Sequence, residues 1–109
     1  MIIDFSKISE NWMQNLKGGC KSVGMKTFSD NLNKIMMLRL EPGASIGLHT
    51  HQTNSEIMLM LHGNGHIIYD NGEFDLHEGE CHYCPKGHAH SLLNNSDSDI
   101  VVYAVVAEQ

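Results

Sequence analysis

Apolar and polar residues form short segments of β type along most of the chain, separated by turn residues. The first clear segment is 34–40, which ends before Pro42-Gly43, and the last is 100–106, which is apolar throughout. The same pattern predicts strands over 46–51, 56–61, 66–69, 74–77, 81–84 and 90–93. Short strands with Gly-rich turns, and no alternating helices, are typical of an all-β sandwich or closed barrel.

We expect one domain over the whole chain, 1–109, made of an N-terminal arm, about 1–33, and a barrel, about 34–106. The arm has the weakest pattern. Ser9–Trp12 could begin a short helix that ends before Gly18-Gly19. Alternatively, the arm is extended and Trp12 anchors it on the barrel.

A hairpin is predicted near residue 71, because Asn71-Gly72 is a preferred centre for a type I′ turn. Five acidic residues fall between Asp70 and Glu80, with no Lys or Arg among them. We interpret them as the solvated edge of this hairpin.

Two strands are apolar on both faces, whereas a strand that is wet on one face alternates. One is 56–61, which is apolar after Glu56, and the other is 100–106. Their outer faces therefore need a cover. A second copy of the chain, giving a homodimer, is the preferred interpretation, and cover by the N-terminal arm is the alternative.

Charge and composition narrow the possible partners. Seven Lys and Arg against 13 Asp and Glu give a net charge of −6, and no window gathers the basic residues. Nucleic acid is therefore not expected as a partner. No apolar run is long enough for a bilayer span, so no membrane partner is expected. The N-terminus does not resemble a signal peptide, and three cysteines without one indicate a reducing cytoplasm.

The strongest chemical signal is His49-Thr50-His51 followed by Glu56. Residues i and i+2 of a strand point to the same side, so the two imidazoles share a face. A turn after His51 can bring Glu56 beside them. Imidazole and carboxylate together suit divalent transition-metal ions.

The residues around this triplet form two spaced motifs. The first is Gly43, five residues, His49-x-His51, four residues, Glu56, six residues, Gly63. The second is Gly79, five residues, Pro85-x-Gly87, two residues, His90, three residues, Asn94. Together they resemble the two motifs of the cupin superfamily, and the resemblance covers about residues 34–106.

That resemblance implies a double-stranded β-helix, or jelly-roll barrel, around one divalent metal ion. The ion could be Zn, Fe, Mn, Ni, Co or Cu. By resemblance its ligands would be His49, His51, Glu56 and His90. The remaining motif residues would shape turns and strand ends: Gly43, Gly63, Gly79, Pro85, Gly87 and Asn94. A polar barrel interior without an ion is the alternative, but its buried imidazoles would need other partners.

Strand parity also suggests part of the pocket wall. Met58 and Met60 share the face of Glu56, and Leu92 shares the face of His90. We expect these three side chains to point inward and to line an apolar pocket, and ordinary barrel core is the preferred interpretation over a role in substrate specificity.

Cys81 and Cys84, followed by His88 and His90, offer a second candidate cluster. The three-residue gap from cysteine to histidine is far shorter than in a zinc finger. Residues three apart on a strand face opposite sides. Inert thiols, with one packed outward, are therefore the preferred interpretation over a zinc site or redox pair.

The sequence supports two hypotheses about function. The first is a metal-dependent enzyme acting on a small organic molecule, and the resemblance to cupins implies an oxygenase, decarboxylase or isomerase type, in that order of preference. No catalytic residue beyond the metal site is identified. The second is a non-catalytic module that uses the metal to bind or sense a small molecule. A structural or storage role is weakest, because all four ligand positions are kept.

Overall fold

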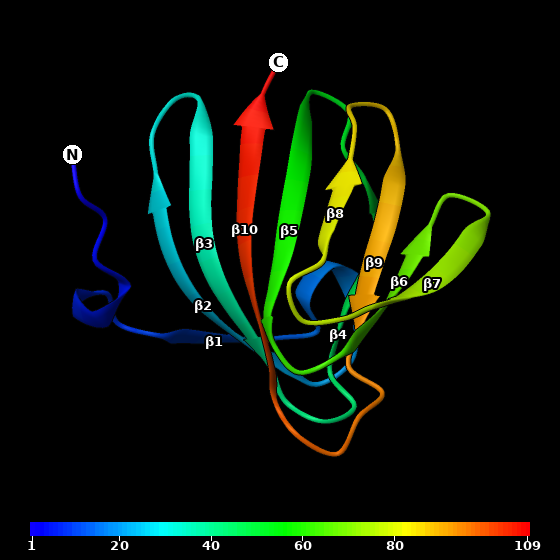
Figure 1. Cartoon of the computed structure of the whole chain (residues 1–109). Helices are drawn as coiled ribbons and strands as arrows, with labels where there is room; N and C mark the ends of the chain where they lie inside the picture. Colours follow the sequence, from blue (N-terminus) through cyan, green and yellow to red (C-terminus); the bar gives the residue numbers. More distant parts are fainter.

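The structure, a computed structural model, describes residues 1–109 and consists of β-strands joined by short loops (Figure 1). The all-β prediction is confirmed. The elements are η1 (Phe5–Lys7), β1 (Asn11–Gln14), η2 (Leu16–Gly18), β2 (Ser22–Ser29), β3 (Asn33–Leu40), β4 (Ser45–Thr50), β5 (Asn54–His62), β6 (Gly65–Tyr69), β7 (Gly72–Leu76), β8 (Cys81–Cys84), β9 (Ala89–Leu93) and β10 (Ile100–Glu108).

The strands form two antiparallel sheets that face each other across the core (Figure 1). The six-stranded sheet has the order β1-β2-β3-β10-β5-β8, and the four-stranded sheet has the order β4-β9-β6-β7. Strands far apart in sequence are thereby made neighbours. β10 lies between β3 and β5, and β9 lies between β4 and β6.

The hydrophobic core fills the space between the sheets and follows the period-two pattern of the strands. On β3, Met36, Leu38 and Leu40 are buried, and on β10, Ile100, Val102 and Ala104 are buried. The four-stranded sheet contributes Ile46, Ile67, Leu76 and Leu92 to the same cluster. Burial of this apolar surface stabilises the barrel that holds the site.

The N-terminal arm is extended, which agrees with the second of the two alternatives for this segment and excludes a helix beginning at Ser9–Trp12. Asn11–Gln14 forms β1 and pairs with β2. Trp12 lies opposite Gly24, and the absence of a side chain there leaves room for the indole ring against the strand. Cross-strand pairing thus outweighs the weak local preference for a helical turn.

The hairpin after β6 also differs from its prediction. Tyr69 pairs with Gly72, so the two central residues are Asp70 and Asn71 rather than Asn71 and Gly72. The positive φ falls on Asp70, at +50°. The carboxylate of Asp70 accepts hydrogen bonds from the backbone N–H of Ala89 and from His88. These bonds to the start of β9 hold the turn at Asp70-Asn71, one residue earlier than the predicted centre.

The structure contains no helix with the length and apolar character that crossing a membrane requires.

Candidate metal centre

Four side chains from three strands meet inside the barrel. His49 lies on β4, His51 directly follows β4, Glu56 lies on β5 and His90 lies on β9. One ligand atom of each lies within 4.8 Å of the others. His51 Nε2 lies 3.1 Å from Glu56 Oε1 and 2.9 Å from His90 Nε2, and His90 Nε2 lies 3.0 Å from Glu56 Oε1.

Strand pairing explains how these residues meet. His49 lies opposite His90 in the β4–β9 pair. The backbone of His51 is fixed by two hydrogen bonds, one donated to His88 O and one accepted from the Gly87 N–H. Glu56 lies opposite Cys84 in the β5–β8 pair, which turns its carboxylate toward the four-stranded sheet. The predicted group is therefore assembled by backbone geometry.

Each imidazole uses Nδ1 for a contact outside the group. His49 Nδ1 donates to Gly47 O at 2.7 Å, and His51 Nδ1 donates to Asn54 Oδ1 at 2.5 Å. His90 Nδ1 lies 3.0 Å from His82 Nε2. Such contacts orient metal-binding histidines and fix the tautomer that leaves Nε2 free. Three Nε2 atoms and one carboxylate oxygen then converge, and this donor set fits a divalent transition-metal ion.

The ionisation of the group is compatible with ion binding. Burial by itself would raise the pKa of Glu56, but hydrogen bonds with His51 and His90 outweigh it and lower the pKa to about 2. The carboxylate is therefore ionised at neutral pH. Burial lowers the pKa of His49, which favours the neutral imidazole that a metal ion needs.

His82 on β8 is a functional candidate that the sequence did not single out. It is buried, and burial followed by the charge of His90 lowers its pKa to about 4. A neutral His82 can accept the Nδ1–H of His90 through Nε2. The inward face of β8 is visible only once its pairing with β5 is known.

Asn54 at the start of β5 is a second such candidate. Its Oδ1 accepts from His51, and its Nδ2 donates to Glu108 Oε1 at 3.1 Å. Glu108, at the end of β10, also accepts from Thr53 Oγ1 at 3.0 Å. His51 is thus oriented by a short network that reaches the barrel mouth.

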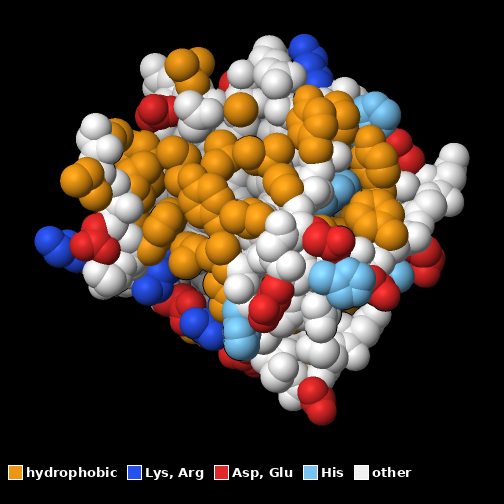
Figure 2. All heavy atoms as spheres, viewed as in Figure 1, with side chains coloured by type: hydrophobic (Ala, Val, Ile, Leu, Met, Phe, Trp, Pro, Cys, Tyr) orange, Lys and Arg blue, Asp and Glu red, His pale blue; other side chains and the backbone are white.

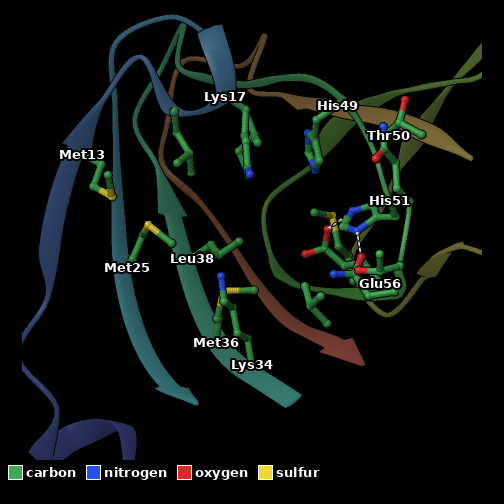
Figure 3. A pocket seen from close by; sticks show the side chains of 17 residues that line it. Met13, Lys17, Met25, Lys34, Met36, Leu38, His49, Thr50, His51 and Glu56 are labelled. Carbon is green, nitrogen blue, oxygen red and sulfur yellow. Dashed lines mark hydrogen bonds and ion pairs between the residues drawn. The ribbon is translucent and has the colours of Figure 1, made fainter. Parts of the chain in front are cut away.

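A cavity of about 540 Å³ opens beside the four converging side chains (Figure 3). Met58 lies on its wall, as strand parity indicated. Met60 and Leu92 point inward but pack in the closed core, so the expectation that they line this cavity needs correction. Their side chains meet above Gly65, deeper in the barrel than the cavity reaches. The wall is formed by Met13, Leu16, Lys17, Met25, Lys34, Met36, Leu38, Ile46, His49, Thr50, His51, Gln52, Thr53, Asn54, Glu56, Met58 and Val106.

The cysteines occupy opposite faces of β8, as their spacing indicated. Cys81 is exposed and Cys84 is buried, and neither forms a disulfide. Cys84 lies beside His82 and His90, so a metal-binding group of these three is geometrically conceivable. However, burial raises the pKa of Cys84 to about 11, which keeps it a neutral thiol rather than a thiolate ligand.

The motif glycines and Asn94 lie at turns around the site. Gly43, Gly63, Gly79 and Gly87 all have φ between +81° and +91°. At Gly63 a side chain would also meet Ile100 at 2.9 Å. Pro85 directly follows β8, and its carbonyl accepts from His88 in the turn that leads to β9. Asn94 is buried, and its amide donates to Leu40 O and Ser98 O.

Known proteins agree with this architecture. A protein of Thermotoga maritima named oxalate-binding protein is 28% identical over 97% of this chain and 93% of its own length. A crystal structure from the same organism, described as a predicted oxalate decarboxylase, superposes with a TM-score of 0.94 at 25% identity and covers 100% of both chains. A sugar phosphate isomerase of the cupin superfamily from Silicibacter pomeroyi shares the fold, with a TM-score of 0.81, 20% identity and coverage of 100% and 76% of the two chains.

The family described as Cupin domain matches residues 36–106. That range runs from within β3 to within β10 and contains all four converging side chains. The two facing antiparallel sheets are the double-stranded β-helix that the sequence predicted. This chain belongs to the cupin family.

Proposed function

We propose that the chain binds one divalent transition-metal ion through His49, His51, Glu56 and His90 and acts as a metal-dependent enzyme on a small carboxylic acid. The observation that carries the proposal is the convergence of three Nε2 atoms and a carboxylate beside an open cavity, whose wall includes His49, His51 and Glu56. A six-coordinate ion held by four side chains keeps positions for a ligand.

Decarboxylation is the reaction class best supported among oxygenase, decarboxylase and isomerase. The similar protein described as a predicted oxalate decarboxylase favours it over the other two. When bound, the ion would polarise a carboxylate or carbonyl oxygen of the substrate. The chain itself would hold Glu56 ionised, keep the imidazoles oriented, and shield the substrate from water with the apolar cavity wall.

Binding without turnover is the second candidate. It is favoured by the name of the similar oxalate-binding protein and by the polar groups of the cavity wall. Apart from the four converging side chains, the only titratable side chains on that wall are Lys17 and Lys34. A proton donor for turnover would have to be one of these lysines or water.

Elemental analysis followed by a decarboxylation screen tests both candidates. We expect close to one metal ion per chain, and release of CO₂ from a carboxylic acid that disappears in His49→Ala. Tight binding of the acid without CO₂ release would favour the binding module. Protein that holds no ion after loading with each candidate metal would overturn both.

We further propose that the chain forms a homodimer through the outer face of the six-stranded sheet. Phe5 of the arm packs edge-on against Tyr103 at 6.2 Å, so the arm covers part of this face. Beyond the arm, Ile57, Leu61 and Tyr83 are 42%, 44% and 54% exposed. Figure 2 shows hydrophobic side chains gathered over the left and upper part of this side, with polar and acidic side chains toward its lower right. Such patches mark protein interaction sites.

Light scattering tests the dimer. We expect twice the chain mass of 12.2 kDa for the natural protein and the single mass for Ile57→Glu. Leu32→Glu, which changes an exposed leucine in the loop between β2 and β3, is the matched control and should stay dimeric. A natural protein that is monomeric at high concentration would refute this interface.

A further inference from the structure

Two lysines that form no ion pair face the cavity of the candidate metal centre. Lys17 and Lys34 both line it, and neither side chain forms an ion pair or hydrogen bond. Figure 3 shows Lys17 and Lys34 reaching into the cavity from opposite ends, with their amino groups pointing toward each other. Unpaired ammonium groups beside an enclosed surface attract anions.

The position of Lys17 is built into the fold. It lies in η2, between Asn15 and Gly18, and both Asn15 and Lys17 have left-handed backbone conformations, with φ of +56° and +55°. This conformation costs free energy for residues with side chains. Two hydrogen bonds of Asn15 hold the turn closed, one donated by Nδ2 to Gly19 O and one accepted by its carbonyl from the Gly18 N–H.

Two glycines bring this turn directly onto β4. A Cβ on Gly47 would lie 2.1 Å from Lys17 O, and a Cβ on Gly19 would lie 2.0 Å from Ser45 O. Only residues without a side chain allow such an approach. The turn that carries Lys17 is thus fixed against the same strand that carries His49.

Lys34 reaches the cavity by strand parity. It shares the inward face of β3 with Met36 and Leu38 and lies at the open end of the barrel. A lysine on an otherwise apolar inner face is unusual for a core strand. Its charge also acts on Glu108, whose side chain is occupied by Thr53 and Asn54.

The cavity contains more apolar surface than a two-carbon acid needs. Met13, Met25, Met36 and Met58 line it together with Leu38. Its volume of about 540 Å³ lies within the range of about 300–1,000 Å³ that is typical of sites for drug-sized ligands. Oxalate is one of the smallest organic dianions. The flexible thioether chains of methionine adapt to irregular apolar ligands.

We propose that the preferred ligand is a dicarboxylic acid longer than oxalate, with one carboxylate at the metal centre, an apolar body against the methionines and a second carboxylate contacted by Lys17 and Lys34. This inference rests on the proposed metal-dependent function and names its ligand class.

Electrostatics agrees with an anionic ligand. The chain as a whole carries −6, yet the charged side chains of the cavity wall are two lysines and Glu56. An anionic ligand in the cavity therefore meets positive charge from the lysines on its wall.

Calorimetry on Mn²⁺-loaded protein tests the proposal, because Mn²⁺ accepts oxygen ligands at open positions. The probes are unbranched dicarboxylates from oxalate to suberate, each beside the monocarboxylate of equal length. We expect the affinity to pass through a maximum at a dicarboxylate longer than oxalate. Lys17→Met and Lys34→Met should each weaken that acid by about tenfold or more, the scale of a hydrogen bond to a charged group.

Lys26→Met is the matched control, because it removes the same charge from a lysine that faces a separate hollow beside Phe5. All three lysine variants should bind Mn²⁺ normally. Their affinity for each monocarboxylate should stay within about twofold of that of the natural protein. An optimum at oxalate, or equal weakening by Lys26→Met, would overturn this inference and leave the metal function standing. If no carboxylate binds the Mn²⁺ protein, the proposed function itself fails.

Discussion

The eight histidines divide into two groups of four with different surroundings. The inner group lies in the barrel, where ring nitrogens approach one another and one carboxylate: His49, His51, His82 and His90. The outer group lies on the surface, and each of its members is paired with acidic side chains: His62, His66, His77 and His88.

The two groups share a residue type but not a chemistry. Asp75 and Glu73 bind both ring nitrogens of His66, so neither nitrogen is left for an ion. In the inner group, one nitrogen of each of the three candidate ligands faces the others. Burial and convergence therefore distinguish a candidate metal-binding histidine here, and the number of histidines does not. The acidic residues near the hairpin serve as partners for the outer group.

Removing a ligand from the inner group should have the largest effect. We expect His51→Ala and Glu56→Ala each to lose most of the bound metal while the fold is kept, because the apolar strands carry the barrel. Elemental analysis measures the loss, and circular dichroism checks the fold. His66→Ala, from the outer group, is the control and should keep its metal. Unchanged metal in both inner variants would show that the ion binds elsewhere.

Acidification should have the next largest effect, because it acts on the inner histidines as metal ligands. Imidazoles bind metal only when neutral, so the ion should be released as the pH falls through about 6. Glu56, with a pKa of about 2, stays ionised over that range, so protons on the histidines cause the release. Metal content after dialysis at graded pH measures it. Full occupancy at pH 4 would contradict histidine ligation.

A smaller loss of metal affinity is expected on substitution of His82, which contacts His90 but is not one of the four converging side chains. His82→Phe should weaken metal affinity by about 10- to 100-fold, as other losses of an orienting contact do. His82→Gln, which can still accept the Nδ1–H of His90, should keep part of the metal affinity that His82→Phe loses. Competition with a chelator measures both. Tyr83→Phe, on the outward face of β8, is the control. Equal metal affinities for His82→Phe and this control would show that His82 does not contribute to metal binding.

The outer group should give the smallest effect. Hydrogen bonds with Asp75 and then Glu73 raise the pKa of His66. Its pairing therefore stabilises the fold fully below the unfolded-state pKa of about 6.5 and loses that effect as the pH rises through the folded-state pKa. The destabilisation by His66→Ala should be under about 1 kcal/mol and smaller at pH 9 than at pH 6, as measured by urea unfolding. A larger cost at pH 9 would contradict this pairing.

The all-β class was predictable from local strand and turn patterns, whereas the double-stranded β-helix and the full quartet also needed the resemblance to cupins. Parity placed His49 beside His51, and turn spacing with the resemblance to cupins added Glu56 and His90. Parity gave the inward direction of Met60 and Leu92 but not their depth, since depth depends on how the two sheets pack.

Other features depend on contacts between distant segments, which no local pattern encodes. Lys17 enters the cavity only because Gly19 and Gly47 let its turn lie on β4. The arm is a strand because β2 offers it an edge. His82 contacts His90 through sheet pairing. A lysine on the inner parity of a strand, as at Lys34, is one signal that could have been read from the sequence.

Anomalous X-ray scattering from a crystal of the metal-loaded protein tests the central claim most directly. At the absorption edge of the ion that elemental analysis identifies, we predict one strong peak per chain, within bonding distance of Nε2 of His49, His51 and His90 and of the Glu56 carboxylate. A peak on the outer histidines or at Cys84, or no peak inside the barrel, would contradict the assignment.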